Sequence, residues 1–142
     1  MIEDVIYKLI EALSECHEMG IMHRNLKPDN ILFNERHELM ITDFTLARLM
    51  IQNFNAYTPE DPKERERSGR EARRLWYRAP ELLLRKVNYS QEIDMWSVGC
   101  LMAEIASSQV LFDGDSEIEQ LFKIFSFLGS PCAELLEIVS AD

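Results

Sequence analysis

Residues 23–32 read His-Arg-Asn-Leu-Lys-Pro-Asp-Asn-Ile-Leu, and the rest of the chain is best interpreted outward from this stretch. Two short apolar runs, 31–33 and 39–42, follow it and are separated by a polar turn. Apolar runs around such a turn predict a β-hairpin. The hairpin would hold Asn30 and Asp43 at its two open ends.

Further strings follow in order along the chain. They read Asp43-Phe44-Thr45, Trp76-Tyr77-Arg78-Ala79-Pro80-Glu81, Asp94-Met95-Trp96-Ser97-Val98-Gly99-Cys100, Phe-Asp-Gly-Asp-Ser-Glu-Ile over 112–118 and Gln-Leu-Phe-Lys-Ile-Phe over 120–125. With residues 23–32 they resemble the H-R-D-L-x-x-x-N, D-F-G and A-P-E motifs of protein kinases. The later strings resemble the cyclin-dependent kinase (CMGC) group. The resemblance extends from near Met1 to about Pro131, and a helical module unrelated to kinases would have to reproduce all of these strings by chance.

The resemblance implies a role for each matching residue. In kinases the loop Asp receives the substrate hydroxyl proton, the loop Asn and the D-F-G Asp hold magnesium, and a loop Lys contacts the transferred phosphate. By matching position, these are Asn25 (base), Asn30 and Asp43 (metal) and Lys27 (phosphate). The positions that brace the site are matched by His23, Arg24, Asp94 and Glu81.

Three departures from the family pattern weaken the expected active site. Asn25 replaces the catalytic Asp, and a carboxamide cannot accept a proton near neutral pH. Thr45 replaces a Gly, and a β-branched residue resists positive φ and hinge motion. Arg74 stands where a Thr normally bonds the catalytic Asp and the Lys; the alternative is an exposed loop arginine, if an insert shifts the register. Residual catalysis and a site used only for binding both stay open.

The fold class that the resemblance implies is mainly α with a small β-hairpin, a partial kinase C-lobe from an α+β family fold. At 142 residues the chain suits one domain, and we expect the N-lobe to be absent because no G-x-G-x-x-G or V-A-I-K precedes the catalytic loop. The expected partner Arg of Glu81 would also lie outside the chain. The predicted parts are the first helix and catalytic loop (1–33), the metal-motif hairpin and activation segment (34–81, with an insert at 59–74), the central and following helices (82–131) and a truncated tail (132–142).

Helical spacing of apolar residues predicts a helix over 2–19 that stops at Gly20. Ser90 is a plausible cap for a largely buried helix over roughly 91–106. Ser116-Glu117-Ile118-Glu119 forms a capping box for a helix to about Leu128, which Gly129 ends. A long connector with little apolar periodicity is expected over 45–75.

Within this connector, Tyr57-Thr58-Pro59-Glu60 resembles the activation-loop phosphorylation sequence of cyclin-dependent kinases. A phosphate on Thr58 would suit Arg24 and Arg48 as partners. An unmodified Thr in a turn is the other interpretation. Residues 63–74 carry six basic and three acidic side chains, which predicts either a solvated loop or a docking insert.

Composition limits the classes of partner and compartment. A net charge of −10 disfavours nonspecific nucleic-acid binding, and no apolar run is long enough for a membrane span. The acidic start lacks a signal-peptide pattern, and three scattered cysteines predict free thiols, hence an intracellular protein of the cytoplasm or nucleus. A Cys16/His17/His23 metal site has the wrong spacing for zinc.

We therefore predict a serine/threonine kinase relative of cyclin-dependent type that is impaired or inactive as it stands, with a non-catalytic decoy or scaffold as the alternative. Mg²⁺ and ATP are the cofactors that the family implies, and we expect this chain to bind them weakly or not at all. The expected partners are proteins, either a substrate or a cyclin-like or kinase partner, with no nucleic acid and no membrane.

Overall fold

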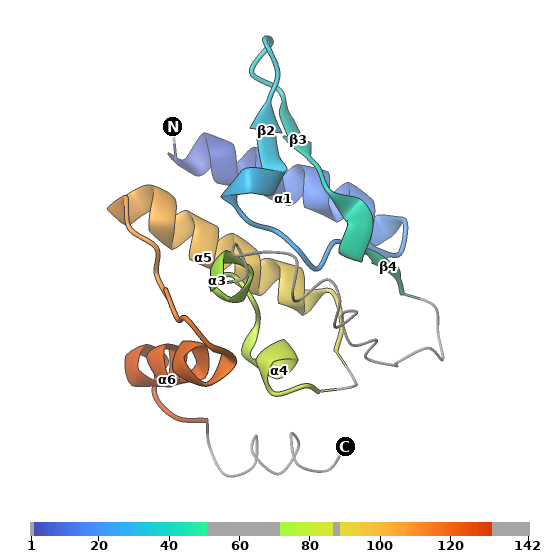
Figure 1. Ribbon diagram of the computed structural model, residues 1–142. Coiled ribbons are helices and arrows are strands. Elements are labelled where there is room, and N and C mark those ends of the chain that lie inside the picture. The colour runs from blue at the N-terminus through green and yellow to red at the C-terminus, as the bar shows by residue number, and fades with distance from the viewer. Residues whose placement is uncertain (1, 51–71, 87–88, 132–142) are drawn as a thin grey trace.

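The computed structural model describes residues 2–50, 72–86 and 89–131 (Figure 1). Two long helices, α1 (Ile2–Glu18) and α5 (Glu92–Ser107), pack side by side. A hairpin of β2 (Ile31–Phe33) and β3 (Leu39–Ile41) lies against α1. The short helix α4 (Pro80–Leu83) packs on α6 (Glu117–Leu128), beyond α5. The expectation of a mainly helical fold with a small hairpin is confirmed.

Helix α1 forms where its apolar spacing predicts. Ile6, Leu9 and Leu13 are spaced three and four residues apart and are buried. Acidic residues occupy the first turn, where their negative charge interacts favourably with the helix dipole. The helix ends one residue earlier than predicted, at Glu18. Gly20 follows with φ +75° and donates its N–H to the His17 carbonyl at 2.9 Å. A residue with a side chain would be strained at this φ, which explains the glycine.

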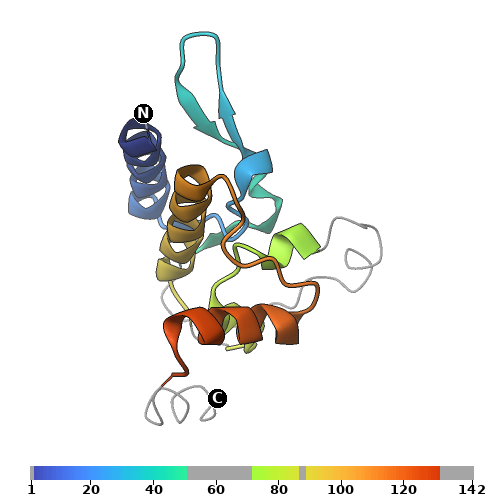
Figure 2. The same cartoon turned by 90° about the vertical axis from the view of Figure 1, so that its left-hand side faces the viewer.

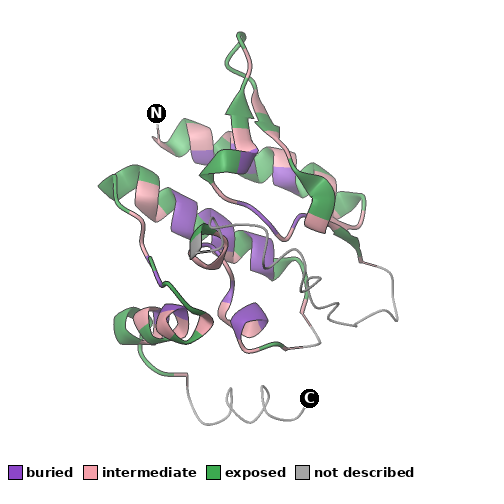
Figure 3. Ribbon diagram, viewed as in Figure 1, coloured by how far each residue is buried: buried purple, intermediate pink, exposed green. Residues whose placement is uncertain are grey.

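Helix α5 forms the centre of the molecule, as the buried positions along it show (Figure 3). It spans Glu92–Ser107, one residue later than the prediction at both ends. The predicted Ser90 cap is wrong: Gln91 is the N-cap, no side chain caps the helix, and Ser90 accepts only through its backbone carbonyl, from the Ile93 N–H. The first turn is therefore preceded by a tight backbone turn that needs no side-chain cap.

The hairpin pairs Ile31 with Ile41 and Phe33 with Leu39 in antiparallel register. Its turn is held by the Asn34 side chain, whose Oδ1 accepts the N–H groups of Arg36 and Glu38, both at 2.9 Å. This arrangement confirms the predicted hairpin.

A second antiparallel ladder was not predicted: β1 (Ile21–Met22) pairs with β4 (Arg48–Leu49), beyond the hairpin. The predicted connector thus contains β4, a short 3₁₀ turn at Phe44–Leu46 and α3 (Ala72–Leu75) among its described residues.

Helix α6 begins as its capping sequence predicts, because Ser116 Oγ accepts the Glu119 N–H at 3.1 Å. The Glu119 carboxylate accepts the N–H of Asp115 rather than of Ser116. The second hydrogen bond of the capping box therefore reaches the residue before the N-cap instead of the N-cap itself. Close packing precedes the helix: a Cβ on Gly114 would lie 2.5 Å from the Gln120 backbone nitrogen. The Gly114 N–H instead donates to buried Gln120 Oε1 at 2.8 Å. In the part of the chain described, no helix has the length and apolar character to cross a membrane.

Candidate functional site

The backbone of the 23–32 loop is held by one buried carboxylate. Asp94, in the first turn of α5, has no solvent exposure. Its Oδ2 accepts the His23 N–H at 2.8 Å, and its Oδ1 accepts the Arg24 N–H at 2.7 Å. The His17 ring nitrogen Nε2 lies 2.9 Å from the same Oδ2. Three hydrogen bonds satisfy a charge that would be very unfavourable if buried alone, so Asp94 fixes the loop as the resemblance implies.

His23 links the loop to the metal motif. Its side chain is fully buried, and Nε2 lies 3.0 Å from the Thr42 carbonyl, the residue before Asp43. The Asn25 N–H donates to Nδ1 at 3.3 Å. A ring that donates through Nε2 and accepts through Nδ1 is the neutral tautomer. Its edge-on contact with Phe44, at 4.7 Å between centroids, completes the link.

Both His17 and His23 thus have hydrogen-bond partners elsewhere, at Asp94 and at the Thr42 carbonyl. Within the described ranges, no cluster of three or more His, Cys, Asp or Glu side chains is arranged to hold a metal. A zinc-type site of Cys16, His17 and His23 receives no support from this geometry.

The predicted meeting of Asn30 and Asp43 follows from the hairpin. The Thr42 N–H donates to the Asn30 carbonyl at 2.9 Å, which closes the open end of the two strands. The buried Asn30 side chain donates through Nδ2 to the Asn25 carbonyl at 2.7 Å. Asn25 in turn donates through its own Nδ2 to Asp43 Oδ2 at 3.1 Å. The base position, the loop Asn and the metal-motif Asp therefore form one connected group.

Asp43 itself is exposed and adopts the left-handed conformation, with φ +61°. The Thr45 hydroxyl donates to its Oδ1 at 2.5 Å. This hydrogen bond is the main reason that the pKa of Asp43 is lowered below 3.8, with a further contribution from the positive charge of Lys27. The sequence alone presents Thr45 only as a stiff substitute for Gly. In the structure Asp43, not Thr45, has positive φ, and Thr45 acts as a hydrogen-bond donor.

Arg74 lies beside the catalytic loop. It lines a small cavity of about 10 Å³ together with Asn25 and Lys27. This location agrees with the motif alignment and disfavours the alternative of an exposed loop arginine. The other residues around the cavity are Arg24, Leu26, Leu46, Tyr77, Arg78 and Ser97, so four basic side chains surround it.

Three further contacts near the loop were missed by motif matching. The buried Tyr77 donates its hydroxyl to Glu104 Oε2 at 2.5 Å, and Ser97 Oγ donates to the Tyr77 carbonyl at 2.7 Å. Burial, together with the Glu104 carboxylate, raises the pKa of Tyr77 well above 10. The Arg24 guanidinium lies 5.4 Å from the centroid of the Tyr89 ring. Only the Trp-Tyr-Arg string could have indicated Tyr77, and it does not identify Glu104.

The structure describes some of the other predicted site residues and leaves others outside the described ranges. The Glu81 side chain has no hydrogen bond or ion pair with any other described residue, and it stays a predicted brace position. Thr58 and the tail 132–142 lie outside the described residues, as does most of the 59–74 insert. Arg73, at the described end of the insert, lies 4.0 Å from Asp29 in an exposed ion pair.

The donor chemistry at Asn30 and Asp43 fits magnesium. A carboxylate has about four acceptor sites, of which the Asn25 and Thr45 side chains use one on each oxygen of Asp43, and Asn30 uses only its amide nitrogen in the bond to Asn25. Magnesium takes six oxygen ligands and commonly binds one or two protein groups plus phosphates and water. Asn30 and Asp43 would be those protein groups.

Comparisons with known proteins agree with this geometry. Residues 1–137 match the protein kinase domain family. The chain is 47% identical over 130 residues to cell division control protein 2 homolog 3 of Trypanosoma brucei brucei, covering 92% of this chain and 38% of that protein. It is 42% identical to mitogen-activated protein kinase p38a of Drosophila melanogaster (99% of this chain, 35% of that one) and 41% identical to cyclin-dependent kinase B2-1 of Arabidopsis thaliana (98% and 41%).

Among solved structures, the chain matches a protein in the crystal structure of the yeast RNA Pol II CTD kinase CTDK-1 complex. The TM-score is 0.78 at 36% identity, over 94% of this chain and 40% of that one. The chain therefore spans less than half the length of these relatives. From its motifs, its fold and these matches, the chain belongs to the protein kinase family and is similar to cyclin-dependent kinases and their relatives.

Proposed function

We propose that this chain is part of a serine/threonine kinase relative in which phosphoryl transfer is impaired and binding of another protein is the main activity. The observation that carries the proposal is the hydrogen bond from Asn25 Nδ2 to Asp43 Oδ2. The residue at the base position uses its amide group as a donor to the metal-motif carboxylate. A carboxylate at position 25 could not make this bond, because both partners would then be acceptors at neutral pH.

The chemical consequence is the loss of general-base catalysis. A positioned base is typically worth about a hundredfold to ten-thousandfold in rate. The Asn25 Oδ1 oxygen can still accept a hydrogen bond from a substrate hydroxyl, which orients that hydroxyl without removing its proton. Arg74 beside Asn25 adds positive charge where the family pattern has a neutral Thr. Both changes move the site away from proton abstraction.

A low residual kinase activity is the second candidate. Its support is that Lys27 and Asn30 lie in the loop and that Asp43 is hydrogen-bonded to it through Asn25. In that case Asn30 and Asp43 would hold magnesium, and Lys27 would contact the transferred phosphate of ATP. Magnesium would supply charge neutralisation at the phosphates. The protein groups would then contribute positioning only, since none of the three is a base for the substrate hydroxyl. We expect Mg-ATP to bind weakly.

The binding activity that we propose is that of a decoy or scaffold for a protein of the kinase pathway, such as a cyclin-like or kinase partner. Its support is that the loop backbone stays braced by Asp94 although the chemistry has changed. A loop held in one conformation presents a fixed surface, which can bind a partner even without catalysis. An intracellular location, in the cytoplasm or nucleus, is part of the same proposal.

The test measures phosphoryl transfer by the native gene product. The protein is purified from its natural source by an affinity tag added to the gene at its chromosomal position. Three forms are compared with radiolabelled Mg-ATP and a generic basic protein substrate: the native sequence, Asn25→Asp and Asp43→Ala. We expect the native sequence and Asp43→Ala to be indistinguishable, and Asn25→Asp to be at least about tenfold faster. Gln109→Glu, which adds the same charge at an exposed site just after the end of α5, is the matched control. Transfer by the native sequence that Asp43→Ala abolishes would overturn the proposal.

A further inference from the structure

Asp43 accepts a hydrogen bond on each of its carboxylate oxygens, and both donors are departures from the kinase pattern. Asn25 Nδ2 donates to Oδ2 at 3.1 Å, and the Thr45 hydroxyl donates to Oδ1 at 2.5 Å. The pattern has Asp and Gly at these two positions, and neither side chain could donate at neutral pH. We call Asn25 Nδ2 and the Thr45 hydroxyl the donor pair. Two separate departures thus act on one carboxylate.

A hydrogen-bond donor and a divalent cation compete for the same carboxylate. Both are attracted by its negative charge, and the positive N–H or O–H end of a donor is repelled by a cation bound to the same group. Acceptor sites remain on Asp43, so the donor pair does not block a cation but lowers the free energy gained when one binds. Affinity for such cations also depends on the number of charged ligands, and Asn25 supplies none.

The two donors differ in how easily they can leave Asp43. Asn25 is 8% exposed, and a buried amide that loses its partner is left with an unsatisfied donor, at a cost in free energy. Thr45 is exposed, so its hydroxyl can exchange Asp43 for water at a smaller cost. Asn25 should therefore oppose a bound cation more strongly than Thr45 does.

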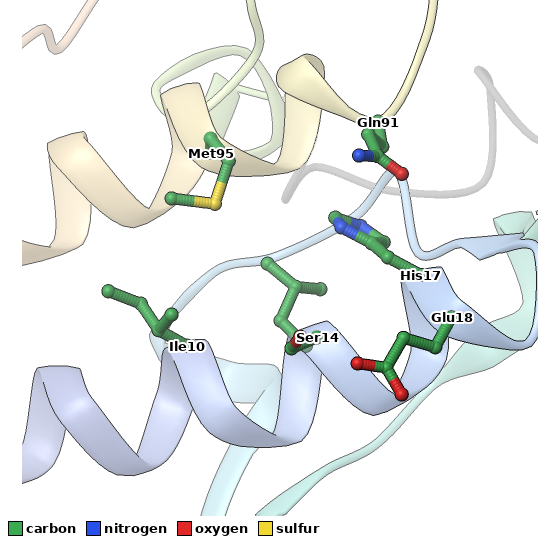
Figure 4. Close-up of a pocket in the computed structure, with 7 residues that line it drawn as sticks. Ile10, Ser14, His17, Glu18, Gln91 and Met95 are labelled. Atoms are coloured by element: carbon green, nitrogen blue, oxygen red, sulfur yellow. The ribbon is translucent and has the colours of Figure 1, made fainter.

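The frame around the site does not depend on the donor pair. The Asn30 side chain donates to the backbone carbonyl of residue 25, a bond that any side chain at this position allows. The buried Asp94 accepts the His23 N–H at 2.8 Å. His17, which lines a groove between α1 and α5 (Figure 4), lies 2.9 Å from the same Asp94 oxygen. Variants of the donor pair should therefore fold, and their effect should be confined to the site.

We propose that Asn25 and Thr45 together lower the affinity of the site for divalent cations, because they supply to Asp43 the positive charge that a cation would otherwise supply. Asn30 and Asp43 then form a low-affinity site for a hard cation such as Mg²⁺ or Mn²⁺, since the available ligand atoms are oxygens. The inference goes beyond the proposed function. Cation binding is measured without ATP or a protein substrate, so either claim can fail while the other holds.

The probe is Mn²⁺, which binds oxygen ligands and broadens the NMR signals of nearby nuclei. It is titrated into the ¹⁵N-labelled full chain, and loss of the Phe44 backbone amide signal reports a cation beside Asp43. Thr45→Val removes the hydroxyl but keeps the branched shape, and it should bind Mn²⁺ at least about threefold tighter than the native chain. Thr45→Ser keeps the hydroxyl and should bind as the native chain does. Asn25→Asp should bind at least about tenfold tighter.

Asn34 offers a matched control in the turn at the tip of the β2–β3 hairpin, which extends away from the helices in Figure 2. Its Nδ2 donates to Glu38 Oε2 at 2.6 Å, so Asn34→Asp also replaces an amide donor with a second carboxylate. The turn and the candidate site lie at opposite ends of the hairpin. Asn34→Asp should therefore change Mn²⁺ binding beside Phe44 by less than about twofold at physiological salt. The same spectra show whether each variant is folded.

Three results would contradict the proposal. If Thr45→Val binds Mn²⁺ no more tightly than the native chain, the hydroxyl orients Asp43 for the cation instead of competing with it. If Thr45→Ser gains as much affinity as Thr45→Val, the hydroxyl is not the cause. If Asn34→Asp gains as much as Asn25→Asp, the effect comes from net charge alone.

Discussion

The two sides of the candidate site, which we call its buried end and its exposed end, differ in what holds them. At the buried end, Asp94 binds the backbone of His23 and Arg24 from a position without solvent exposure. At the exposed end, Asp43 and Thr45 are exposed and hydrogen-bonded to each other, and the buried Asn25 donates its side-chain amide to Asp43. The buried end agrees with the kinase pattern at every position, whereas all three departures, at Asn25, Thr45 and Arg74, concern the exposed end.

This difference shows which part of the site the fold itself requires. A buried charge with three hydrogen bonds cannot be changed without leaving unsatisfied groups in the core. An exposed carboxylate exchanges protein hydrogen bonds for water at small cost. Chemistry can therefore be lost at the exposed end while the loop keeps its shape, and variants at the two ends should differ in stability accordingly.

Asp94→Ala should have the largest effect. It leaves the His23 and Arg24 N–H groups and the His17 ring without their acceptor, and we expect a loss of about 3–5 kcal/mol in the free energy of unfolding. Urea denaturation followed by circular dichroism measures it. Glu35→Ala, in the exposed hairpin turn, is the control and should change stability by less than about 0.5 kcal/mol. An equal effect of the two variants would remove the distinction between the two ends.

Tyr77→Phe tests the Tyr77–Glu104 hydrogen bond, which lies near the loop. Loss of the hydrogen bond to Glu104 should cost about 1.5–3 kcal/mol at neutral pH. Because the pKa of Tyr77 is raised in the folded state, its contribution is complete below the ordinary value of 10 and is lost as pH rises above it. The native chain should therefore lose stability above pH 10 more steeply than Tyr77→Phe. Parallel pH curves in thermal melts would contradict this.

Asn25→Asp tests the exposed end. It replaces a hydrogen bond to Asp43 with two neighbouring carboxylates, and we expect a destabilisation of about 1–2 kcal/mol at neutral pH and low salt. Millimolar Mg²⁺ should restore most of it, because a cation between the carboxylates replaces the lost donor. The native chain should respond far less to Mg²⁺ in the same melting experiment. A variant that is as stable as the native chain without Mg²⁺ would show that the Asn25–Asp43 bond does not form.

Thr45→Ala should have the smallest effect on stability, below about 1 kcal/mol, because Asp43 is exposed. Its effect on titration is more informative. The Thr45 hydroxyl is the main cause of the lowered Asp43 pKa, so the variant should raise that pKa toward 3.8. A carboxyl-detected NMR titration measures it, and Thr45→Ser should restore the native value. An unchanged pKa would assign the shift to the Thr45 backbone N–H and the positive charge of Lys27 instead.

Much of the fold could be predicted because its signals are local. The apolar spacing of α1, the glycine after it and the Ser116 cap each depend on residues within one or two turns. The meeting of Asn30 with Asp43 was also predictable, since a hairpin necessarily brings its two ends together.

The rest depends on contacts that sequence spacing does not encode. The β1–β4 ladder joins runs of two residues, too short for an alternating pattern. The Ser90 cap was wrong because the rule recognises a residue type before a helix but not whether a backbone turn replaces the cap. Motif matching gave Asn25 as a missing base but could not show that its amide donates to Asp43. That direction depends on the side-chain rotamer, which only the structure supplies.

The most direct test of the account is whether the Asn25 side chain is a donor to Asp43. We would follow the Asn25 side-chain amide resonances in ¹⁵N-labelled protein from pH 6 downward, with Asp43→Asn as the control. The account predicts that these resonances shift with a midpoint below 3.8, the pKa range of Asp43, and that the shift is absent in Asp43→Asn. Amide resonances that do not change through the Asp43 titration would contradict it, because the Asn25 amide would then not donate to Asp43 and would be available to a substrate.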